Sequence, residues 1–207
     1  MQLTDFNPDD YHNHLCIMTG DPSTNTFGYA FGYMNIDTFN IDAIIANTVV
    51  GEKARRRYSY YEGLGDRGIR IDAIVRELYA LMEYYRPSRF VSENNFFNAK
   101  MPDAAKALTE SVCAYESAIR MYMKDAILVQ IPPLSIKSEL KVKNMKDKAS
   151  VKESVGKVPM IKEAIIGNFE ILDEHSIDAI AALITYINRL KRFTEDISNK
   201  SIRLKRG

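Results

Sequence analysis

The sequence predicts one α/β domain built on a mixed β-sheet with helices packed on its faces. Three runs typical of antiparallel strands come first, and strand-like runs then alternate with amphipathic helices. The 207 residues, 46% of them hydrophobic, are enough to bury a sizeable core. No stretch rich in Pro, Gly or Ser divides the chain. We therefore expect a polar lead at residues 1–13, one domain at 14–192 and a basic tail at 193–207.

Different features identify the three predicted N-terminal strands. The run 14–18 is apolar and ends at the turn residues 19–25, whereas 27–35 alternates small with aromatic residues and 41–50 is rich in β-branched residues. Strands that follow one another this closely are expected to pair as an antiparallel meander. The segment 51–68 combines arginine, tyrosine and glycine without a period, and predicts a surface loop.

Three later segments have helical periodicity. Apolar residues recur at three- and four-residue steps in 71–85, 103–124 and 176–192. Between these helices, 89–93 and 126–131 are short strand-like runs, and two prolines close the second. The lysine-rich region that follows predicts a loop with one short helix, and the C-terminal tail has no clear period.

Charged residues are segregated along the chain, although the net charge is only +1. Residues 134–162 hold eight lysines against three acids, and residues 189–207 hold seven Lys or Arg against two acids. Concentrated basic segments favour binding to a polyanion such as nucleic acid. Solvated lysines in a loop would give the same pattern.

Two observations exclude other classes of protein. No stretch approaches the ~18 consecutive apolar residues of a membrane span, and the acidic, polar N-terminus is unlike a signal peptide. We therefore expect a cytoplasmic protein with no membrane partner. The two cysteines, Cys16 and Cys113, lie in apolar surroundings, which predicts buried thiols and not a disulfide or a zinc site.

Three acids lie where predicted elements begin or end. Asp21 follows the first strand, Glu93 ends the strand between the two long helices, and Asp178 lies in the first turn of the last helix. Acids at the carboxyl ends of parallel strands can converge at one edge of a sheet. Clustered carboxylates favour Mg²⁺ or Mn²⁺ and metal-assisted phosphoester chemistry. Taken singly, each acid has a simpler explanation, as a turn cap, a surface charge or a helix N-terminal residue.

The motifs that contain these acids resemble, in order and spacing, the three acidic motifs of the RuvC-like Holliday-junction resolvases (crossover junction endodeoxyribonucleases). They read IMTGDPSTNTFGYAF at 17–31, RFVSENNFFNAK at 89–100 and DEHSIDAIAAL at 173–183. That family belongs to the ribonuclease H-like superfamily, so the resemblance, which spans residues 14 to about 190, implies a ribonuclease H-like mixed sheet.

The resemblance implies a catalytic site residue by residue. Asp21, Glu93 and Asp178 would hold two Mg²⁺ or Mn²⁺ ions. His175 stands where many members of the family have a fourth acid and some bacterial members have His. It could ligate a metal through its neutral imidazole or take a proton from the attacking water.

Further residues of the implied site come from the basic segment and the second motif. Lys137 and Lys148 match two family lysines, eleven positions apart, that approach the DNA and the scissile phosphate. Lys148 would stabilise charge at the phosphate, and Lys137 would position the backbone. Phe96 matches an aromatic that stacks on bases at the junction centre. The adjacent acids Asp173 and Glu174 are alternative sources of the acid that His175 replaces.

The implied activity is resolution of Holliday junctions, in DNA recombination and repair, by paired metal-dependent hydrolysis of phosphodiesters. The products would be nicks with 5′-phosphate and 3′-hydroxyl ends, and no small-molecule cofactor is expected. Because a four-way junction has two-fold symmetry, the resemblance also implies a homodimer, with the helix at 103–124 as the candidate interface.

Extensions at 1–13, 51–68 and 189–207 depart from the cellular pattern and resemble the bacteriophage branch of the family. The expected location is thus the cytoplasm of a bacterial or phage-infected cell. Two other functions remain open at this point. One is a ribonuclease H-like nuclease acting on hybrid or flap DNA, and the other is a junction-binding protein without catalysis.

Overall fold

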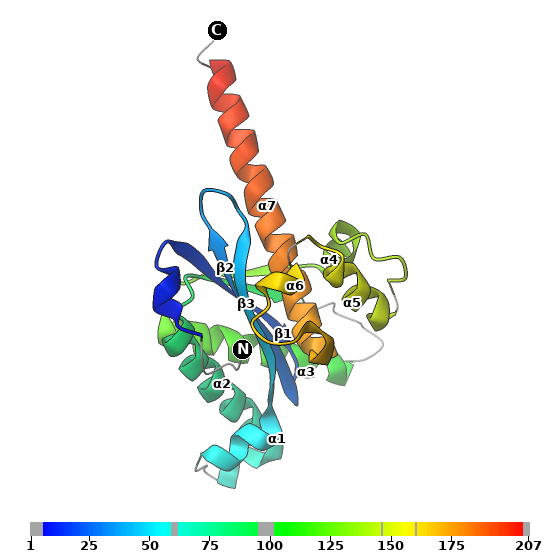
Figure 1. Cartoon of the computed structure of the whole chain (residues 1–207). Coiled ribbons are helices and arrows are strands. Elements are labelled where there is room, and N and C mark those ends of the chain that lie inside the picture. Colours follow the sequence, from blue (N-terminus) through cyan, green and yellow to red (C-terminus); the bar gives the residue numbers. More distant parts are fainter. Residues whose placement is uncertain (1–5, 59–61, 95–101, 146, 160, 205–207) are drawn as a thin grey trace.

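A five-stranded mixed sheet forms the centre of the molecule (Figure 1). The computed structural model describes residues 6–58, 62–94, 102–145, 147–159 and 161–204. The strands are β1 (His14–Pro22), β2 (Thr26–Asn35), β3 (Ile41–Val50), β4 (Arg89–Glu93) and β5 (Leu128–Ile131). Their order is β3-β2-β1-β4-β5, with the first three antiparallel and β4 and β5 parallel to β1. The predicted mixed sheet is confirmed.

Helices cover both faces of this sheet. One face carries α2 (Gly65–Tyr85) and α3 (Pro102–Tyr122). The other carries α7 (Glu174–Leu204), with α4 (Pro133–Glu139), α5 (Lys148–Gly156) and α6 (Ile161–Ala164) beside it (Figure 1). Short 3₁₀ helices at Pro8–Tyr11 and Phe169–Ile171 complete these layers. The three predicted helices correspond to α2, α3 and α7.

The core has two halves because the central strands bury side chains on both faces. Ile17 packs with the apolar residues of α7, whereas its neighbour Met18 packs with those of α2 and α3, and both are completely buried. Each such side chain contributes about 1.5–3 kcal/mol of burial free energy. The sheet is therefore held rigidly between two layers of helices, and its edges have fixed positions.

The N-terminal lead contributes to this core, which its polar composition did not predict. Phe6 is buried and its ring stacks on Tyr11 and packs against Tyr33. The hydroxyl of Tyr84 on α2 also donates a hydrogen bond to the Phe6 carbonyl at 2.9 Å. These contacts attach the described part of the lead to α2 and the sheet.

Four local predictions are wrong. The expected loop at 51–68 contains the short helix α1 (Gly51–Ala54), 3₁₀ turns at Arg55–Arg57 and Glu62–Leu64, and the start of α2. The lysine-rich region forms three short helices and not one. The last helix continues through the expected tail to Leu204 and projects beyond the body of the molecule (Figure 1). Cys16 is buried as expected, but Cys113 is exposed on the outer side of α3.

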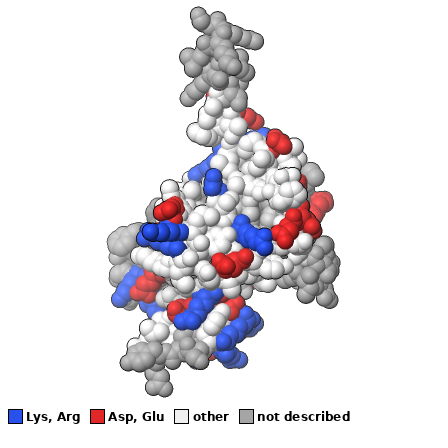
Figure 2. Space-filling view, turned by 90° about the vertical axis from the view of Figure 1, so that its left-hand side faces the viewer, with Lys and Arg blue, Asp and Glu red and all other residues white. Residues whose placement is uncertain are grey.

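Charge is distributed unevenly around the molecule. On the side that lies at the left of Figure 1, basic and acidic side chains are interspersed without a continuous basic surface (Figure 2). The helices α4 and α5, which belong to the lysine-rich segment 134–162, lie on the other side, next to α7. In the described part of the chain, no helix has the length and apolar character needed to cross a membrane.

Candidate active site

The parallel strands β1 and β4 end at the same edge of the sheet, and each carries an acid there. Their register pairs Gly20 with Ser92, so Asp21 and Glu93 follow at adjacent positions. Side chains alternate along a strand, so Asp21 projects to the same face as Thr19. The Thr19 hydroxyl donates to the Ala179 carbonyl of α7 at 2.7 Å, which identifies this face as the one that α7 covers.

The first turns of α7 contribute the third acid and the histidine. Asp178 directly precedes Ala179, the residue bonded to β1, and is therefore close to the acid-bearing edge. His175 lies one turn earlier, and its Nδ1 donates to Oδ2 of Asp21 at 2.7 Å. The other ring nitrogen, Nε2, is 3.1 Å from the hydroxyl of Thr26 at the start of β2. Both nitrogens of this imidazole therefore have partners.

A glycine in β2 allows α7 to begin so close to the sheet. Gly28 pairs with Asp21 across β1 and β2. A Cβ atom at this position would overlap the backbone carbonyl of His175 and lie 2.7 Å from the His175 Cβ. A residue without a side chain is thus required beside Asp21 for the histidine to reach it.

Burial and the charges of neighbouring acids raise the pKa values of two of the acids. Burial, together with the charges of Asp21 and Asp178, raises the pKa of Glu93 to about 7. Burial and the charge of Asp21 likewise raise the pKa of Asp178 to about 6. The hydrogen bond to Asp21 raises the pKa of His175 above its usual 6.5. The acids that are far apart in sequence thus interact at one site.

Two lysines face this cluster from α4 and α5. The charges of Lys137 and Lys148 both act to lower the pKa values of Glu93 and Asp178. Lys148 forms a 2.7 Å ion pair with Glu174. The ammonium of Lys137 donates to the backbone carbonyl of residue 145 at 2.8 Å, which fixes the connection between α4 and α5.

Asp173 has a structural task at the beginning of α7. Its Oδ1 accepts hydrogen bonds from the backbone N–H and the hydroxyl of Ser176, at 2.8 and 2.6 Å. The hydroxyl of Thr48 on β3 donates to the same oxygen at 2.8 Å. This N-cap bonding occupies Asp173, whereas Glu174 pairs with Lys148 and its Oε1 lies 3.9 Å from Nε2 of His175.

The donor atoms of the cluster suit a hard divalent cation. Three carboxylates and one imidazole face the same edge, and carboxylate oxygens are preferred ligands of Mg²⁺ and Mn²⁺. Among the described residues, no group of three or more His, Cys, Asp or Glu side chains is already close enough together to hold a metal ion. Burial, followed by the charges of the neighbouring acids, raises the pKa values of Glu93 and Asp178, and a bound cation would favour the ionised form of both carboxyls. The donor atoms of these residues therefore suit a divalent cation, and the side chains must move closer to one another to bind it.

We expect the metal-free protein to become more stable at alkaline pH when Glu93 is replaced by Gln. A carboxyl whose pKa is about 7 in the folded state, against 4.5 ordinarily, stabilises the fold below pH ~4.5 and loses that contribution as the pH rises through 7. Glu93→Gln should therefore raise the free energy of unfolding by roughly 2 kcal/mol at pH 8 and by much less at pH 5. Urea unfolding in EDTA measures both values.

The control for this prediction is Glu163→Gln, which removes an exposed carboxylate on α6. A gain from Glu93→Gln that is equal at the two pH values, or no greater than that of the control, would contradict the raised pKa of Glu93.

The structure brings together Asp21, Glu93, His175 and Asp178, with Lys137 and Lys148 beside them. Phe96, predicted to stack on bases, lies outside the described residues. Sequence reasoning missed Thr26 and Gly28, which hold the histidine in place. Their only signal in the sequence was the position of both residues immediately after the turn that follows Asp21.

Comparison with known proteins gives a structural match and no sequence match. No protein-family model and no curated protein sequence matched the chain. Thermus thermophilus RuvC in complex with Holliday junction substrate superimposes with a TM-score of 0.56 at 13% identity, covering 83% of this chain and 92% of that one. Yeast mitochondrial Holliday junction resolvase Ydc2 gives 0.54 at 12% identity, covering 91% and 87%. The fold is ribonuclease H-like.

This match confirms the fold that the sequence motifs implied. Another structure of Thermus thermophilus RuvC gives the same TM-score of 0.56, at 14% identity. The strand order places β1 and β4 side by side, so their acids lie at one edge of the sheet. The bond from Thr19 to Ala179 brings the acid of α7 to the same edge. The likeness to the bacteriophage branch stays a prediction.

Proposed function

We propose that this protein is a divalent-metal-dependent endodeoxyribonuclease that resolves Holliday junctions. It would hydrolyse a phosphodiester in each of two strands and leave nicks with 5′-phosphate and 3′-hydroxyl ends. The observation that carries the proposal is the acid cluster of Asp21, Glu93 and Asp178 at the carboxyl edge of β1 and β4. It lies on a fold matching two resolvases over most of their length.

The three acids and His175 are the residues that would hold Mg²⁺ or Mn²⁺. Divalent ions held by these residues would supply Lewis-acid activation of the attacking water and charge neutralisation at the leaving oxygen. The chain itself places Asp21 and Glu93 side by side at fixed strand ends, and α7 closes over them. His175 is oriented by Asp21 and Thr26, so either ligation or proton transfer requires one of these contacts to be exchanged.

The lysines act on the substrate phosphate. Lys148 lies at the first turn of α5, held by Glu174 near Asp178, where its ammonium would stabilise negative charge on a phosphate at the cluster. Lys137 supports the α4–α5 connection through its bond to the carbonyl of residue 145 and would position the DNA backbone.

A homodimer would present two such sites to a two-fold symmetric junction. The helix α3 remains the proposed interface, because its outer side exposes Cys113 and Met121 while Tyr115 and Ile119 pack inward on the sheet. Sedimentation equilibrium with and without junction DNA would measure the state of assembly.

The proposal is tested by cleavage of labelled substrates in Mg²⁺ and in Mn²⁺. We expect symmetric nicks in an immobile four-way junction and none in a linear duplex of the same sequence. Preferential cleavage of RNA–DNA hybrid or flap DNA would replace the proposal with another ribonuclease H-like nuclease. Tight junction binding with no product in either metal would identify a non-catalytic binding protein.

We expect Lys148→Gln to slow junction cleavage by about 10²-fold while changing junction affinity by less than about 3-fold. The reason is that Lys148 is directed at the acid cluster and adds charge where it develops in the reaction. Single-turnover rates at saturating protein separate this effect from binding. Lys124→Gln is the matched control, because this exposed lysine follows α3 at the opposite edge of the sheet. Equal rates for the two variants would remove Lys148 from the mechanism.

A further inference from the structure

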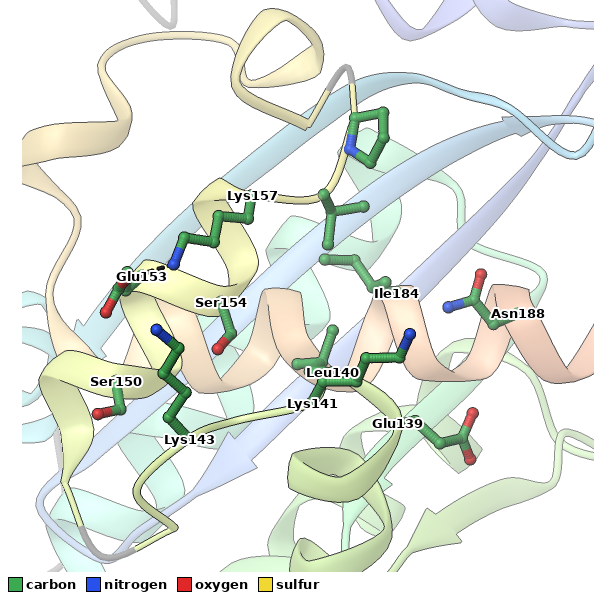
Figure 3. A pocket seen from close by; sticks show the side chains of 12 residues that line it. Glu139, Leu140, Lys141, Lys143, Ser150, Glu153, Ser154, Lys157, Ile184 and Asn188 are labelled. Carbon is green, nitrogen blue, oxygen red and sulfur yellow. Dashed lines mark hydrogen bonds and ion pairs between the residues drawn. The ribbon is translucent and has the colours of Figure 1, made fainter.

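A cavity of about 390 Å³ lies between α5, α7 and the connection from α4 to α5 (Figure 3). Its polar groups lie at two ends. Lys143 lies beside Ser150 and Glu153 at the α5 end, whereas Lys141 extends toward Asn188 of α7. Between them the floor is apolar and comes mainly from Leu140, Val158 and Ile184. None of these residues belongs to the candidate active site.

The acids of this cavity are already paired, so two lysines remain to attract an anion. Glu153 pairs with Lys157. Glu139 accepts from the guanidinium groups of both Arg189 and Arg192 on α7. Within the described residues, neither Lys141 nor Lys143 has an acidic partner within ion-pair distance, although the charge of Lys143 also lowers the pKa of Glu153, and both lysines are exposed. The cavity therefore presents positive charge beside an apolar floor, with the hydroxyl of Ser154 nearby, whereas the Ser150 hydroxyl already donates to Asp147.

The cavity continues the basic side of the active site. The α4–α5 connection that carries Lys141 and Lys143 is fixed at residue 145 by the ammonium of Lys137. α5 begins with Lys148 at the acid cluster and runs for nine residues, or about 13 Å, along the cavity. That length corresponds to roughly four nucleotides of helical rise.

We propose that this cavity is a second DNA-binding site, which takes the sugar–phosphate backbone of an arm leaving the active site. This inference rests on the proposed function. Lys141 and Lys143 bind phosphate oxygens, the Ser154 hydroxyl donates a hydrogen bond to them, and the apolar floor packs against deoxyribose. A free phosphate ligand has the same chemistry, and the experiment below distinguishes it from DNA.

The test compares Lys141→Gln and Lys143→Gln with the control Lys124→Gln. Affinities for a four-way junction and for a linear duplex are measured by fluorescence anisotropy in EDTA, over a series of salt concentrations. Each cavity variant should reduce the magnitude of the slope of the log association constant against log salt concentration by about 1, and should weaken binding 2- to 10-fold. The control should do neither.

The outcomes separate this inference from the proposed function. If the wild type resolves junctions and the cavity variants keep its salt slope, the second DNA site is overturned and the function stands. If the wild type neither prefers nor cleaves junctions, but the affinity of both cavity variants for duplex depends less steeply on salt, the proposed function fails and the second DNA site stands. Calorimetric binding of inorganic phosphate that Lys143→Gln abolishes, with unchanged DNA slopes, would assign the cavity to a free phosphate and overturn the inference.

Discussion

We expect Asp21→Asn to slow junction cleavage by about 10³-fold or more while junction binding is retained. Asparagine keeps an oxygen that can accept the hydrogen bond from Nδ1 of His175, so the histidine stays oriented. What is lost is the negative charge that acts on both Glu93 and Asp178 and that a divalent cation requires. Removal of a negative charge near the DNA should leave affinity unchanged or higher. Single-turnover cleavage and anisotropy give the two quantities.

Asp37→Asn is the matched control for this substitution. Asp37 is exposed in the turn between β2 and β3, at the edge of the sheet opposite the acid cluster. The Asp37→Asn variant should cleave junctions at the wild-type rate. Wild-type cleavage by the Asp21 variant would show that this acid holds no metal and takes no part in the reaction.

The second large effect is expected from Gly28→Ala. The added methyl group would overlap the His175 backbone, so either β2 or the start of α7 must shift. Overpacking of this kind costs about 1–3 kcal/mol of stability. A displacement of about 1 Å at His175 and Asp178 should also reduce cleavage by roughly 10²-fold. Thermal unfolding and single-turnover cleavage measure these two effects.

Gly68→Ala provides the contrasting glycine. It lies inside α2, where a new Cβ meets only the Leu64 Cβ at an ordinary 3.4 Å. Alanine there should stabilise the protein by about 0.5–1 kcal/mol and leave cleavage unchanged. If Gly28→Ala behaved like Gly68→Ala in both assays, the close approach of α7 to β2 would not be needed for the site.

The sequence identified the strands and helices where burial imposes a regular pattern. The β-branched run at 41–50 and the apolar stripe of 71–85 both pack on the core, and both elements formed where they were expected. The helical end of α7 could not be predicted in this way. Phe193 and Ile197 on it are exposed, so no buried face imposes a period there.

The prediction of a loop at 51–68 was wrong for a different reason. Its helical turns depend on tertiary contacts that have no local signature in the sequence. Arg57 pairs with Glu77 of α2, and the Gly51 N–H donates to the carbonyl of Asn25 in the turn before β2. Contacts between residues that are 20 or more positions apart decide the structure there.

The site shows the same division between local and long-range information. The acid motifs were visible because each lies at the end of an element, and their order resembled a known family. The partners of His175 were not visible, since Asp21 and Thr26 are separated from it by 154 and 149 positions. The assignment of Asp173 to capping likewise needed the contact with Thr48, which lies on another layer of the fold.

The central claim is that Asp21, Glu93 and Asp178 form one divalent-metal site. Its most direct test is Mn²⁺ titration, followed by electron paramagnetic resonance, of the wild type, the single variants Asp21→Asn, Glu93→Gln and Asp178→Asn, and the control Asp37→Asn. We expect two bound Mn²⁺ ions per protomer in the wild type and the control, and loss of at least one in every site variant. Identical Mn²⁺ binding by all five proteins would contradict the account.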